Sequence, residues 1–545
     1  MGDLPAIGTQ GHQPVWKQHH RSDTRVHRQH LLASIHRLCG KFLGGSIPES
    51  IGRLTNLLAV QMAQNQFIGE IPVSFFNLSS IYEIYLGFNH LNGSLPSTLF
   101  DTVPLLEHLL LNNNNLHGNI PASASNASYL VEIDLFNNEF SGIIPSRFGN
   151  SQYLWWVEIG QNQLEAREAS DWVFLNSLTN CSDLATLDLQ QNRLGGFLPN
   201  SLADLSPGIT TLIIAQNQIT GNLPSRIGNL VNLTIFRAND NLLTGGLPDS
   251  IGNMRSLNVL SLKGNRFSGQ IPDSMGNLYQ LSRVDLQNNF FTGRIPSSLG
   301  GLANLQELDM SSNRLSGQIP IELLSLQSLS IRLDLSNNLL TGPLTREIGR
   351  LRNLKWLGAA NNHLSGEIPD SIGDCLRECI PRRYSSVNEQ LERPARAGSF
   401  KQSPSQKIPN FLGSIKGLQL LNLSFNEFEG QVPVNGVFKN STAISLSGNS
   451  KLCGGDPILH LHLCDEQSNN SSGRKHLSTA LKIIIAVAST VLCLVFALCL
   501  FAAFGRLKRL DKKFSFNPME EQFRRASYPE LLSATDGFAP SNIIE

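Results

Sequence analysis

An asparagine recurs every 24 or 25 residues along most of this chain, and this spacing constrains the fold more than any other feature. It belongs to the pattern L-x-x-L-x-L-x-x-N-x-L-x-G-x-I-P, and one clean unit runs from Leu257 through Asn265 and Gly269 to Pro272. Two intervals are longer, 30 residues before Asn192 and 64 before Asn426. The fourteen marker asparagines are Asn65, Asn89, Asn114, Asn138, Asn162, Asn192, Asn217, Asn241, Asn265, Asn289, Asn313, Asn338, Asn362 and Asn426.

Each position of the unit has a physical reason. The L-x-L pair alternates with a period of two, which indicates a short strand with leucines on one face. A single turn cannot bury that face, so many turns must stack into a solenoid with a parallel sheet on its concave side. The asparagine can bond main-chain groups that lie buried where the chain leaves the strand. Glycine permits the turn that follows, and Ile-Pro favours an extended segment. Glycine and proline in every unit argue against amphipathic helices.

Composition excludes several classes of function. The 43 basic and 43 acidic residues balance, whereas a nucleic-acid-binding domain would normally be basic. The eight cysteines form no C-x-x-C pair, so a zinc ribbon is not expected. No paired carboxylates or Ser/His/Asp motif indicates an enzyme. We therefore predict no catalytic residue, no metal and no cofactor.

One uncharged apolar run, 483–504, predicts a transmembrane helix. At 1.5 Å per residue it would extend about 33 Å, close to the ~30 Å hydrocarbon core. Basic residues are denser after the run than before it, which places the C-terminal side in the cytoplasm. All nine N-x-S/T sequons precede the run, which suggests an extracellular N-terminal side. The predicted glycosylation sites are Asn77, Asn92, Asn126, Asn180, Asn232, Asn422, Asn440, Asn469 and Asn470.

Four blocks of sequence carry a family resemblance. They are DWVFLNSLTNCS at 171–182, LDLSNN with LTGPL at 333–344, LSFNEFEG at 423–430 and GNSKLCGG at 448–455. In these blocks the chain resembles plant leucine-rich-repeat receptor-like Ser/Thr kinases, and more narrowly the grass immune receptors of the bacterial-blight-resistance type. The resemblance covers roughly residues 41 to 545, with one gap.

The resemblance implies a single-pass plasma-membrane receptor. Its repeats would bind a peptide or protein ligand, pathogen-derived in this subfamily, and a co-receptor kinase would be a partner. It also implies a disulfide between Cys453 and Cys464 that closes the C-terminal cap. The segment 527–538 is similar to the one that precedes the kinase in the family. No G-x-G-x-x-G, V-A-I-K, H-R-D or D-F-G motif is present, so this chain is not expected to be an enzyme.

Ser527 follows Arg524 and Arg525 and is a candidate phosphosite. The alternative is a basic segment solvated next to anionic lipid.

The predicted organisation has seven parts. These are a leader (1–35), leucine-rich repeats (36–375), a segment without the pattern (376–406), last repeats and cap (407–464), a polar stalk (465–482), the transmembrane helix (483–504) and a cytoplasmic juxtamembrane segment (505–545). The irregular segment is either an inserted island or a misread stretch of gene, and we expect the sheet to open there. The missing signal peptide and kinase motifs suit an incomplete receptor-kinase sequence. The alternatives are a kinase-less receptor-like protein or decoy, and a non-functional gene fragment.

Ligand is expected on the concave strands, at the positions that flank L-x-L. Exposed aromatic residues beside charges are typical of interaction hot spots, although scattered aromatics occur on any strand face. The candidate residues are Tyr85, Phe88, Phe136, Trp156, Glu158, Arg237, Asp240, Lys263 and Arg283, with Asp285, Asp309 and Asp334 on later turns.

Overall fold

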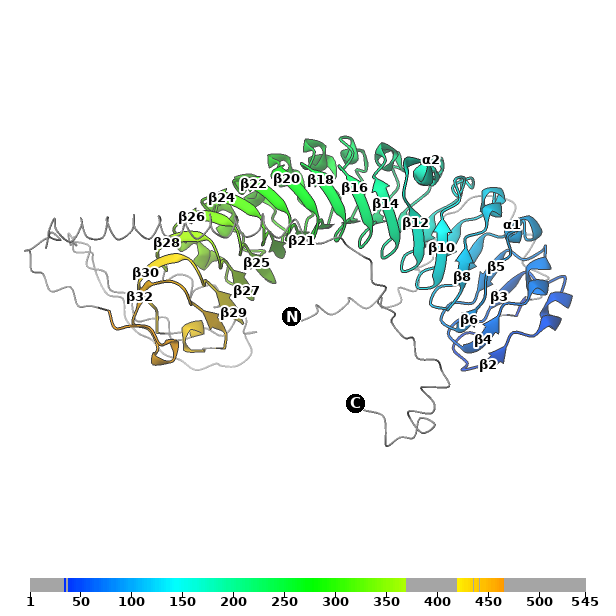
Figure 1. The fold of residues 1–545 in the computed structure, drawn as a ribbon, viewed down its shortest axis with the longest axis horizontal. Helices are drawn as coiled ribbons and strands as arrows, with labels where there is room; N and C mark the ends of the chain where they lie inside the picture. Colours follow the sequence, from blue (N-terminus) through cyan, green and yellow to red (C-terminus); the bar gives the residue numbers. More distant parts are fainter. Residues whose placement is uncertain (1–33, 36–37, 369–418, 435, 441, 465–545) are drawn as a thin grey trace, which may run out of the picture. The chain divides into compact units, whose positions relative to one another are not determined.

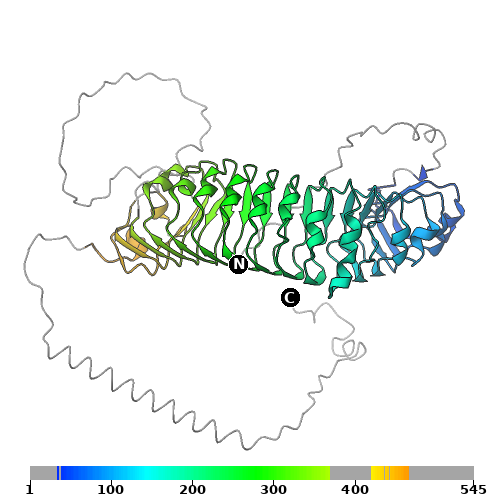
Figure 2. The same cartoon turned by 90° about the horizontal axis from the view of Figure 1, so that it is seen from above.

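The computed structural model describes residues 34–35, 38–368, 419–434, 436–440 and 442–464. In these residues each repeat forms one turn with two strands, and in most turns a short helical segment follows the second strand. The turns follow one another along a curved stack (Figure 1), and Figure 2 shows their helical segments side by side. The predicted leucine-rich-repeat solenoid is therefore the fold of this part of the chain.

The first strands of the turns form a parallel sheet of 16 strands on the inner side of the curve (Figure 1). We call it the main sheet. Its strands are β1 (Ser34–Ile35), β3 (Ala59–Gln61), β5 (Glu83–Tyr85), β7 (His108–Leu110), β9 (Glu132–Asp134), β11 (Trp156–Glu158), β13 (Thr186–Asp188), β15 (Thr211–Ile213), β17 (Ile235–Arg237), β19 (Val259–Ser261), β21 (Arg283–Asp285), β23 (Glu307–Asp309), β25 (Arg332–Asp334), β27 (Trp356–Gly358), β29 (Leu420–Asn422) and β31 (Ile444–Ser445).

The second strands form a flank with 13 strands in one sheet and three in another. The smaller sheet contains β2 (Gly44–Ser46), β4 (Gln66–Glu70) and β6 (His90–Asn92). The larger contains β8 (His117–Asn119), β10 (Glu139–Ile143), β12 (Gln163–Ala166), β14 (Arg193–Phe197), β16 (Gln218–Gly221), β18 (Leu242–Gly245), β20 (Arg266–Gln270), β22 (Phe290–Gly293), β24 (Arg314–Gly317), β26 (Leu339–Gly342), β28 (His363–Glu367), β30 (Glu427–Gln431) and β32 (Lys451–Cys453).

Short helical segments cover the outer side. The α-helices are α1 (Leu99–Thr102), α2 (Val173–Leu178) and α3 (Ile321–Leu324), and the 3-10 turns are η1 (Glu49–Arg53), η2 (Val73–Asn77), η3 (Ala122–Asn126), η4 (Ala169–Trp172), η5 (Asn200–Asp204), η6 (Ile227–Asn229), η7 (Asp249–Asn253), η8 (Asp273–Asn277), η9 (Ser297–Gly301), η10 (Arg346–Arg350), η12 (Gly436–Lys439) and η13 (Pro457–Leu459). The stretched repeat before Asn192 contains η4 and α2, so its additional residues lie in the outer segment. There Trp172 is buried and its indole N–H donates to the Gly195 carbonyl at 2.8 Å.

The main sheet pairs residues at equal offsets in successive repeats. Val259, Leu260 and Ser261 of β19 lie opposite Arg283, Val284 and Asp285 of β21, 24 residues later. Leu260 is fully buried, whereas its two strand neighbours are partly exposed on the opposite face. Each strand therefore gives one side chain to the core and two to the inner surface. Because the register repeats, those two positions form continuous columns across the turns.

A ladder of buried asparagine side chains joins the turns. The Asn265 Oδ1 atom accepts from the Leu243 N–H of the preceding turn at 3.0 Å. Its Nδ2 atom donates to the Ala238 carbonyl of that turn at 2.9 Å and to the Leu262 carbonyl of its own turn at 3.1 Å. One amide thus pairs main-chain groups that are sealed from water. The ladder also includes Asn449, which bonds Phe428, Leu423 and Leu446 and extends the set of fourteen.

The residue before each marker asparagine has left-handed backbone, which the repeat analysis did not predict. Asn288 has φ 56°, Asn337 has φ 57° and Gly264 has φ 65°. The chain turns sharply here, between the strand and the buried amide. The Gly of the pattern is left-handed as well, with φ 74° at Gly269, so its predicted role in the turn is confirmed.

The main sheet does not open at the irregular segment, and that expectation was wrong. Strand β27 pairs directly with β29, with Trp356 opposite Leu420. The Leu364 N–H donates to Asn426 Oδ1 at 3.1 Å, as one turn does to the next elsewhere in the ladder. Residues 369–418 therefore connect two consecutive turns without separating them. The hydrogen bonds between turns depend on the offset from each marker asparagine, not on the number of residues between two markers.

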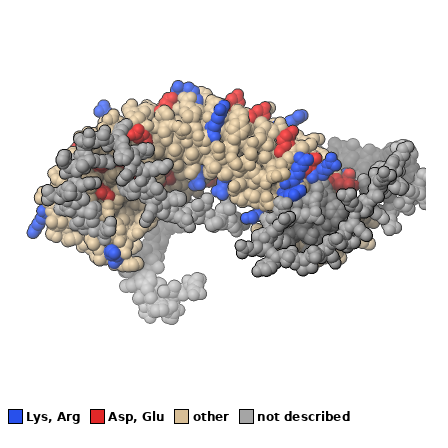
Figure 3. Space-filling model, turned by 180° about the vertical axis from the view of Figure 1, so that it is seen from behind, with Lys and Arg blue, Asp and Glu red and all other residues tan. Residues whose placement is uncertain are grey.

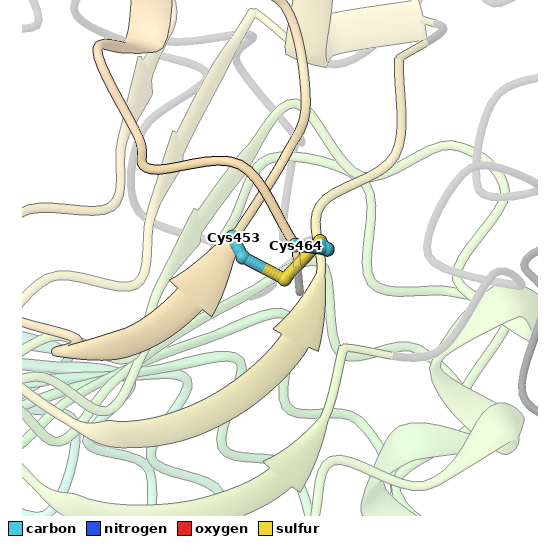
Figure 4. Close-up of a disulfide and its surroundings, with 2 residues drawn as sticks. All are labelled: Cys453 and Cys464. Carbon is cyan, nitrogen blue, oxygen red and sulfur yellow. A yellow bond between two sulfur atoms is a disulfide. The ribbon is translucent and has the colours of Figure 1, made fainter. Parts of the chain in front are cut away.

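A disulfide joins Cys453 at the end of β32 to Cys464 (Figure 4), the pair expected from the resemblance. The Gly454 N–H also donates to the His462 carbonyl at 2.8 Å, so the chain folds back over the last flank strand. Both contacts hold the final turn against the buried Leu452. The C-terminal end of the core is covered in this way.

Several expectations lie outside the described residues. They are the leader up to residue 33, the segment 376–406, the stalk, the run 483–504 and the juxtamembrane segment with Ser527. Among the residues that are described, no helix is long and apolar enough to cross a membrane.

Replacement of a marker asparagine should destabilise the stack. Asn265→Ala leaves the Leu243 N–H buried without its acceptor. It also removes one of the two amide donors from each of the Ala238 and Leu262 carbonyls, which keep their bonds from Asn241 and Asn289, so we expect a loss of roughly 2 kcal/mol of unfolding free energy. Urea unfolding measures it. The control is Asn277→Ala, at an exposed asparagine of the neighbouring outer turn. Equal effects of the two substitutions would contradict the role of the ladder.

Candidate ligand-binding face

Two columns of side chains line the inner face of the main sheet. The first column holds the first residue of each strand, six residues before the marker asparagine, and the second holds the third residue, four before it. In β11 these are Trp156 and Glu158, both half-buried, on either side of the buried Val157. The repeated register places every member of a column beside its counterpart in the next turn.

All nine candidate residues lie on or next to this face. Trp156 and Arg283 belong to the first column, and Tyr85, Glu158 and Arg237 to the second. Phe136 and Lys263 follow their strands by two residues, and Phe88 and Asp240 are the left-handed residues before a marker asparagine.

The candidates do not form a single cluster. From β5 to β21 the main sheet has eight strand-to-strand steps, which at ~4.8 Å each amounts to about 38 Å. The face is better described as local groups. Near its N-terminal end, the Tyr85 ring lies edge-on to His108 at 6.3 Å, and His108 Nδ1 is 3.1 Å from Glu132 Oε2. Burial, followed by Glu83 and Glu132, raises the pKa of Tyr85, so its hydroxyl stays neutral.

A row of carboxylates occupies the second column on β9, β11 and β13. Asp134, Glu158 and Asp188 lie directly opposite one another in the register. Burial raises the pKa of Glu158 to about 7, and the neighbouring Asp188 adds to the shift, while a hydrogen bond with the Trp156 side chain opposes it. Burial likewise raises the pKa of Asp188 to about 6 and that of Asp134 well above its usual range.

A second acidic row, Asp285, Asp309 and Asp334, lies on β21, β23 and β25. Arg332 neutralises two of these carboxylates, with 2.9 Å from its guanidinium to Asp309 and to Asp334. The same guanidinium lies 5.0 Å from the centre of the Trp356 ring. Arg332 and Trp356 were missing from the candidate set, although counting six residues back from Asn338 and Asn362 would have found both.

A groove of 1430 Å³ lies away from this face, on the flank, and is lined by residues such as Asp249, Gln270, Asp273 and Arg294. It follows the valley between the second strands and the outer turns and repeats with the solenoid, so it reflects the architecture of the stack. On the side opposite to that seen in Figure 1, which Figure 3 shows, lysines and arginines lie among acids and many uncharged residues. Among the described residues, no three His, Cys, Asp or Glu side chains converge as metal ligands. The inner face therefore offers the more distinctive chemistry.

Six of the predicted glycosylation sites are exposed: Asn77, Asn92, Asn126, Asn180, Asn232 and Asn440. Asn422 differs because it is a half-buried member of β29 in the second column, and its Oδ1 accepts from the Ser424 hydroxyl at 2.8 Å. A glycan there would project over the inner face. Asn469 and Asn470 lie outside the described residues.

Comparisons with known proteins agree with the fold. The "Leucine rich repeat" family models match residues 255–315 and residues 129–151, 183–205 and 353–375. The receptor kinase-like protein Xa21 of Oryza sativa subsp. japonica is 51% identical over 73 residues, which is 13% of this chain and 7% of that protein. The LRR receptor-like serine/threonine-protein kinase EFR of Arabidopsis thaliana is 46% identical over 79 residues, 14% of this chain and 8% of that protein. The matched stretches thus span a small part of each relative.

Among solved structures, the Arabidopsis receptor kinase HAESA in complex with the peptide hormone IDA and the co-receptor SERK1 is similar, with a TM-score of 0.62 and 29% identity. The alignment covers 76% of this chain and 65% of that one. The chain is therefore a leucine-rich-repeat protein whose repeats are similar to those of plant receptor kinases.

The stability of the solenoid should depend on pH through Glu158. Its pKa is about 7 in the folded chain and 4.5 ordinarily, so between these values the folded state binds more protons than the unfolded state, and the free energy of unfolding falls as pH rises. Glu158→Gln should stabilise the chain by roughly 3 kcal/mol at pH 8 and have little effect at pH 4.5. Urea unfolding at both pH values is the measurement, with the exposed Glu139→Gln as control. Equal effects at the two pH values would contradict the prediction.

Relief of backbone strain at Phe88 should stabilise the fold. A bulky residue rarely adopts left-handed backbone, and Phe88 has φ 54° while half of its side chain is exposed. Phe88→Asn is expected to raise the free energy of unfolding by roughly 1 kcal/mol. The control is Tyr129→Asn, at a similarly exposed ring that is absent from the left-handed positions. A destabilised Phe88→Asn variant would show that the ring itself supports the fold.

Proposed function

We propose that this chain contributes the ligand-binding ectodomain of a single-pass plasma-membrane receptor. In this proposal the inner face of the main sheet binds a peptide or protein ligand, derived from a pathogen, and the N-terminal side is extracellular and glycosylated. Signalling proceeds through a Ser/Thr kinase, with a co-receptor kinase as partner. The named relatives are receptor kinases, and the solved complex contains both a peptide hormone and a co-receptor.

The observation that carries the proposal is the composition of the inner face. A face that only closed the solenoid would need neither large rings nor buried charge. Here the partly exposed Trp156 and Phe136 lie beside carboxylates that burial keeps costly to ionise. Rigid aromatic rings lose little conformational entropy on binding. Charged groups that are partly shielded from water interact more favourably with a partner of opposite charge. This combination favours recognition of another molecule.

Peptide binding tests the proposal directly. The purified full chain is applied to an array of random synthetic decapeptides, and affinities are then measured for the peptides it retains. Trp156→Ala and Phe136→Ala should each weaken binding by about tenfold or more with folding intact, because central aromatic contacts dominate such interfaces.

The matched control is Tyr279→Ala. Tyr279 is an exposed aromatic residue that follows η8 on the outer side, so its loss should leave binding unchanged. If neither inner-face variant loses affinity, or if Tyr279→Ala loses as much, the binding site does not lie on the inner face.

A further inference from the structure

The arginines and lysine of the inner face differ in how they are paired. Arg283 Nε lies 2.7 Å from Glu307 Oε2, and Arg332 contacts two aspartates. No ion pair joins Arg237 or Lys263 to a carboxylate of the described residues. The two cations come from neighbouring turns, Arg237 from the end of β17 and Lys263 from two residues after β19. We call these two positions the cationic place. Asp188 acts on Arg237, and Lys263 acts on Asp285, through charge at a longer range than an ion pair.

Arg237 is held at an electrostatic cost. Its side chain is half-buried beside the buried Phe236, and burial lowers the pKa of its guanidinium. The like charge of Arg283 acts in the same direction, and Asp188 only partly opposes them. An anionic group at this place would relieve both effects, because guanidinium binds carboxylate through short charge-assisted hydrogen bonds. The geometry thus favours a ligand with a carboxylate.

A place suited to a cation lies three strands away. On β11, Trp156 is half-buried with its ring centre 5.3 Å from that of Trp155, and Glu158 lies next to it in the second column. A cation gains from an aromatic face and from a carboxylate together. It would also hold Glu158 in its charged form, against the burial that now favours the neutral acid.

The distance between the two places defines a spacing in the ligand. Strands β11, β13, β15 and β17 are consecutive neighbours, so three steps of ~4.8 Å separate Glu158 from Arg237 by about 14 Å. An extended peptide crossing the strands advances ~3.3 Å per residue, so this distance corresponds to about four residues. Between the two places, β13 presents Thr186 and Asp188, and β15 presents the uncharged Thr211 and Ile213.

We propose that the inner face binds an extended peptide by one carboxylate at Arg237 and Lys263 and by one cationic group, about four residues away, at Trp156 and Glu158. This inference rests on the proposed function and specifies its ligand. The carboxylate belongs to a side chain or to the C-terminus of the peptide.

The neighbouring charges select against a second acidic group. Asp188 and Asp285 occupy the same column as Arg237, each two strands from it, one on either side. A further carboxylate on the ligand would approach one of these aspartates and be repelled. Arg237 attracts one carboxylate of the ligand, and the aspartates on either side repel a second one. Together these two effects make the face specific for the charge pattern of the ligand. The selected ligand has an isolated negative charge.

A series of synthetic decapeptides tests this inference on the purified full chain. Each peptide has capped termini, a Gly/Ser/Leu background, one Lys and one Asp, and the separation of the two charges varies from one to seven residues. We expect the highest affinity at a separation of about four, and at least about a tenfold loss when Asp is replaced by Asn. A second arm replaces the Asp by a free C-terminal carboxylate and distinguishes the two sources of the anion.

Variants assign the two ends. Arg237→Gln should abolish the preference for the Asp peptide over the Asn peptide and keep the preference for Lys, while Glu158→Gln should do the reverse. The control is Arg255→Gln, at an exposed arginine on the outer side.

Affinity that is independent of the separation, or an Asp preference that persists in Arg237→Gln, overturns the inference. If random peptides bind while none of the charged series does, the inference alone is wrong. If neither set binds, the proposed function fails with it.

Discussion

A buried primary amide, repeated once in every turn, is the interaction on which this structure depends. Where the chain leaves each inner strand, main-chain N–H and carbonyl groups are enclosed by the next turn and cannot reach water. The Asn265 side chain bonds such groups from its own turn and from the preceding one. Only a side chain with both a donor and an acceptor at this length can do so. The leucine core supplies the driving force for stacking, and the amide determines how one turn sits on the next.

From that constraint follows the arrangement of the functional surface. Equal offsets from the amide bring side chains together in columns, so residues 24 or more positions apart in the chain become neighbours on the sheet. A substitution in one repeat therefore changes the electrostatic surroundings of two others. Burial makes the carboxylates of Asp134, Glu158 and Asp188 costly to ionise, and for Asp134 and Glu158 the acids at the same offset in the adjacent repeats add to that cost. Whether the inner face is acidic or basic at a given turn therefore depends on the residue that the repeat has in the second column.

Much of the fold could be predicted from the spacing of the asparagines, because the motif is local and each turn repeats it. The positions of Trp156, Glu158 and Arg237 on the inner face also follow from counting. The pairing of Arg332 with two aspartates does not, because it depends on side-chain conformations across two neighbouring strands. Neither does the left-handed backbone at Phe88, where tertiary contacts override the preference of the residue. The continuity of the sheet past residue 368 was missed because sequence distance was taken for spatial distance.

The unbroken pairing of β27 with β29 bears on where a repeat array can accept inserted segments. Trp356 and Leu420 are 64 residues apart, yet they are partners in the sheet like any two strand residues of successive turns. The junction between two turns thus accepts a long additional stretch of chain while the bonding on either side is preserved. A repeat array of this kind can acquire new segments at its junctions with little penalty to the stack, since closing a longer loop adds only about 0.6 kcal/mol for each doubling of its length. Such junctions are natural points for grafting a tag or a small domain.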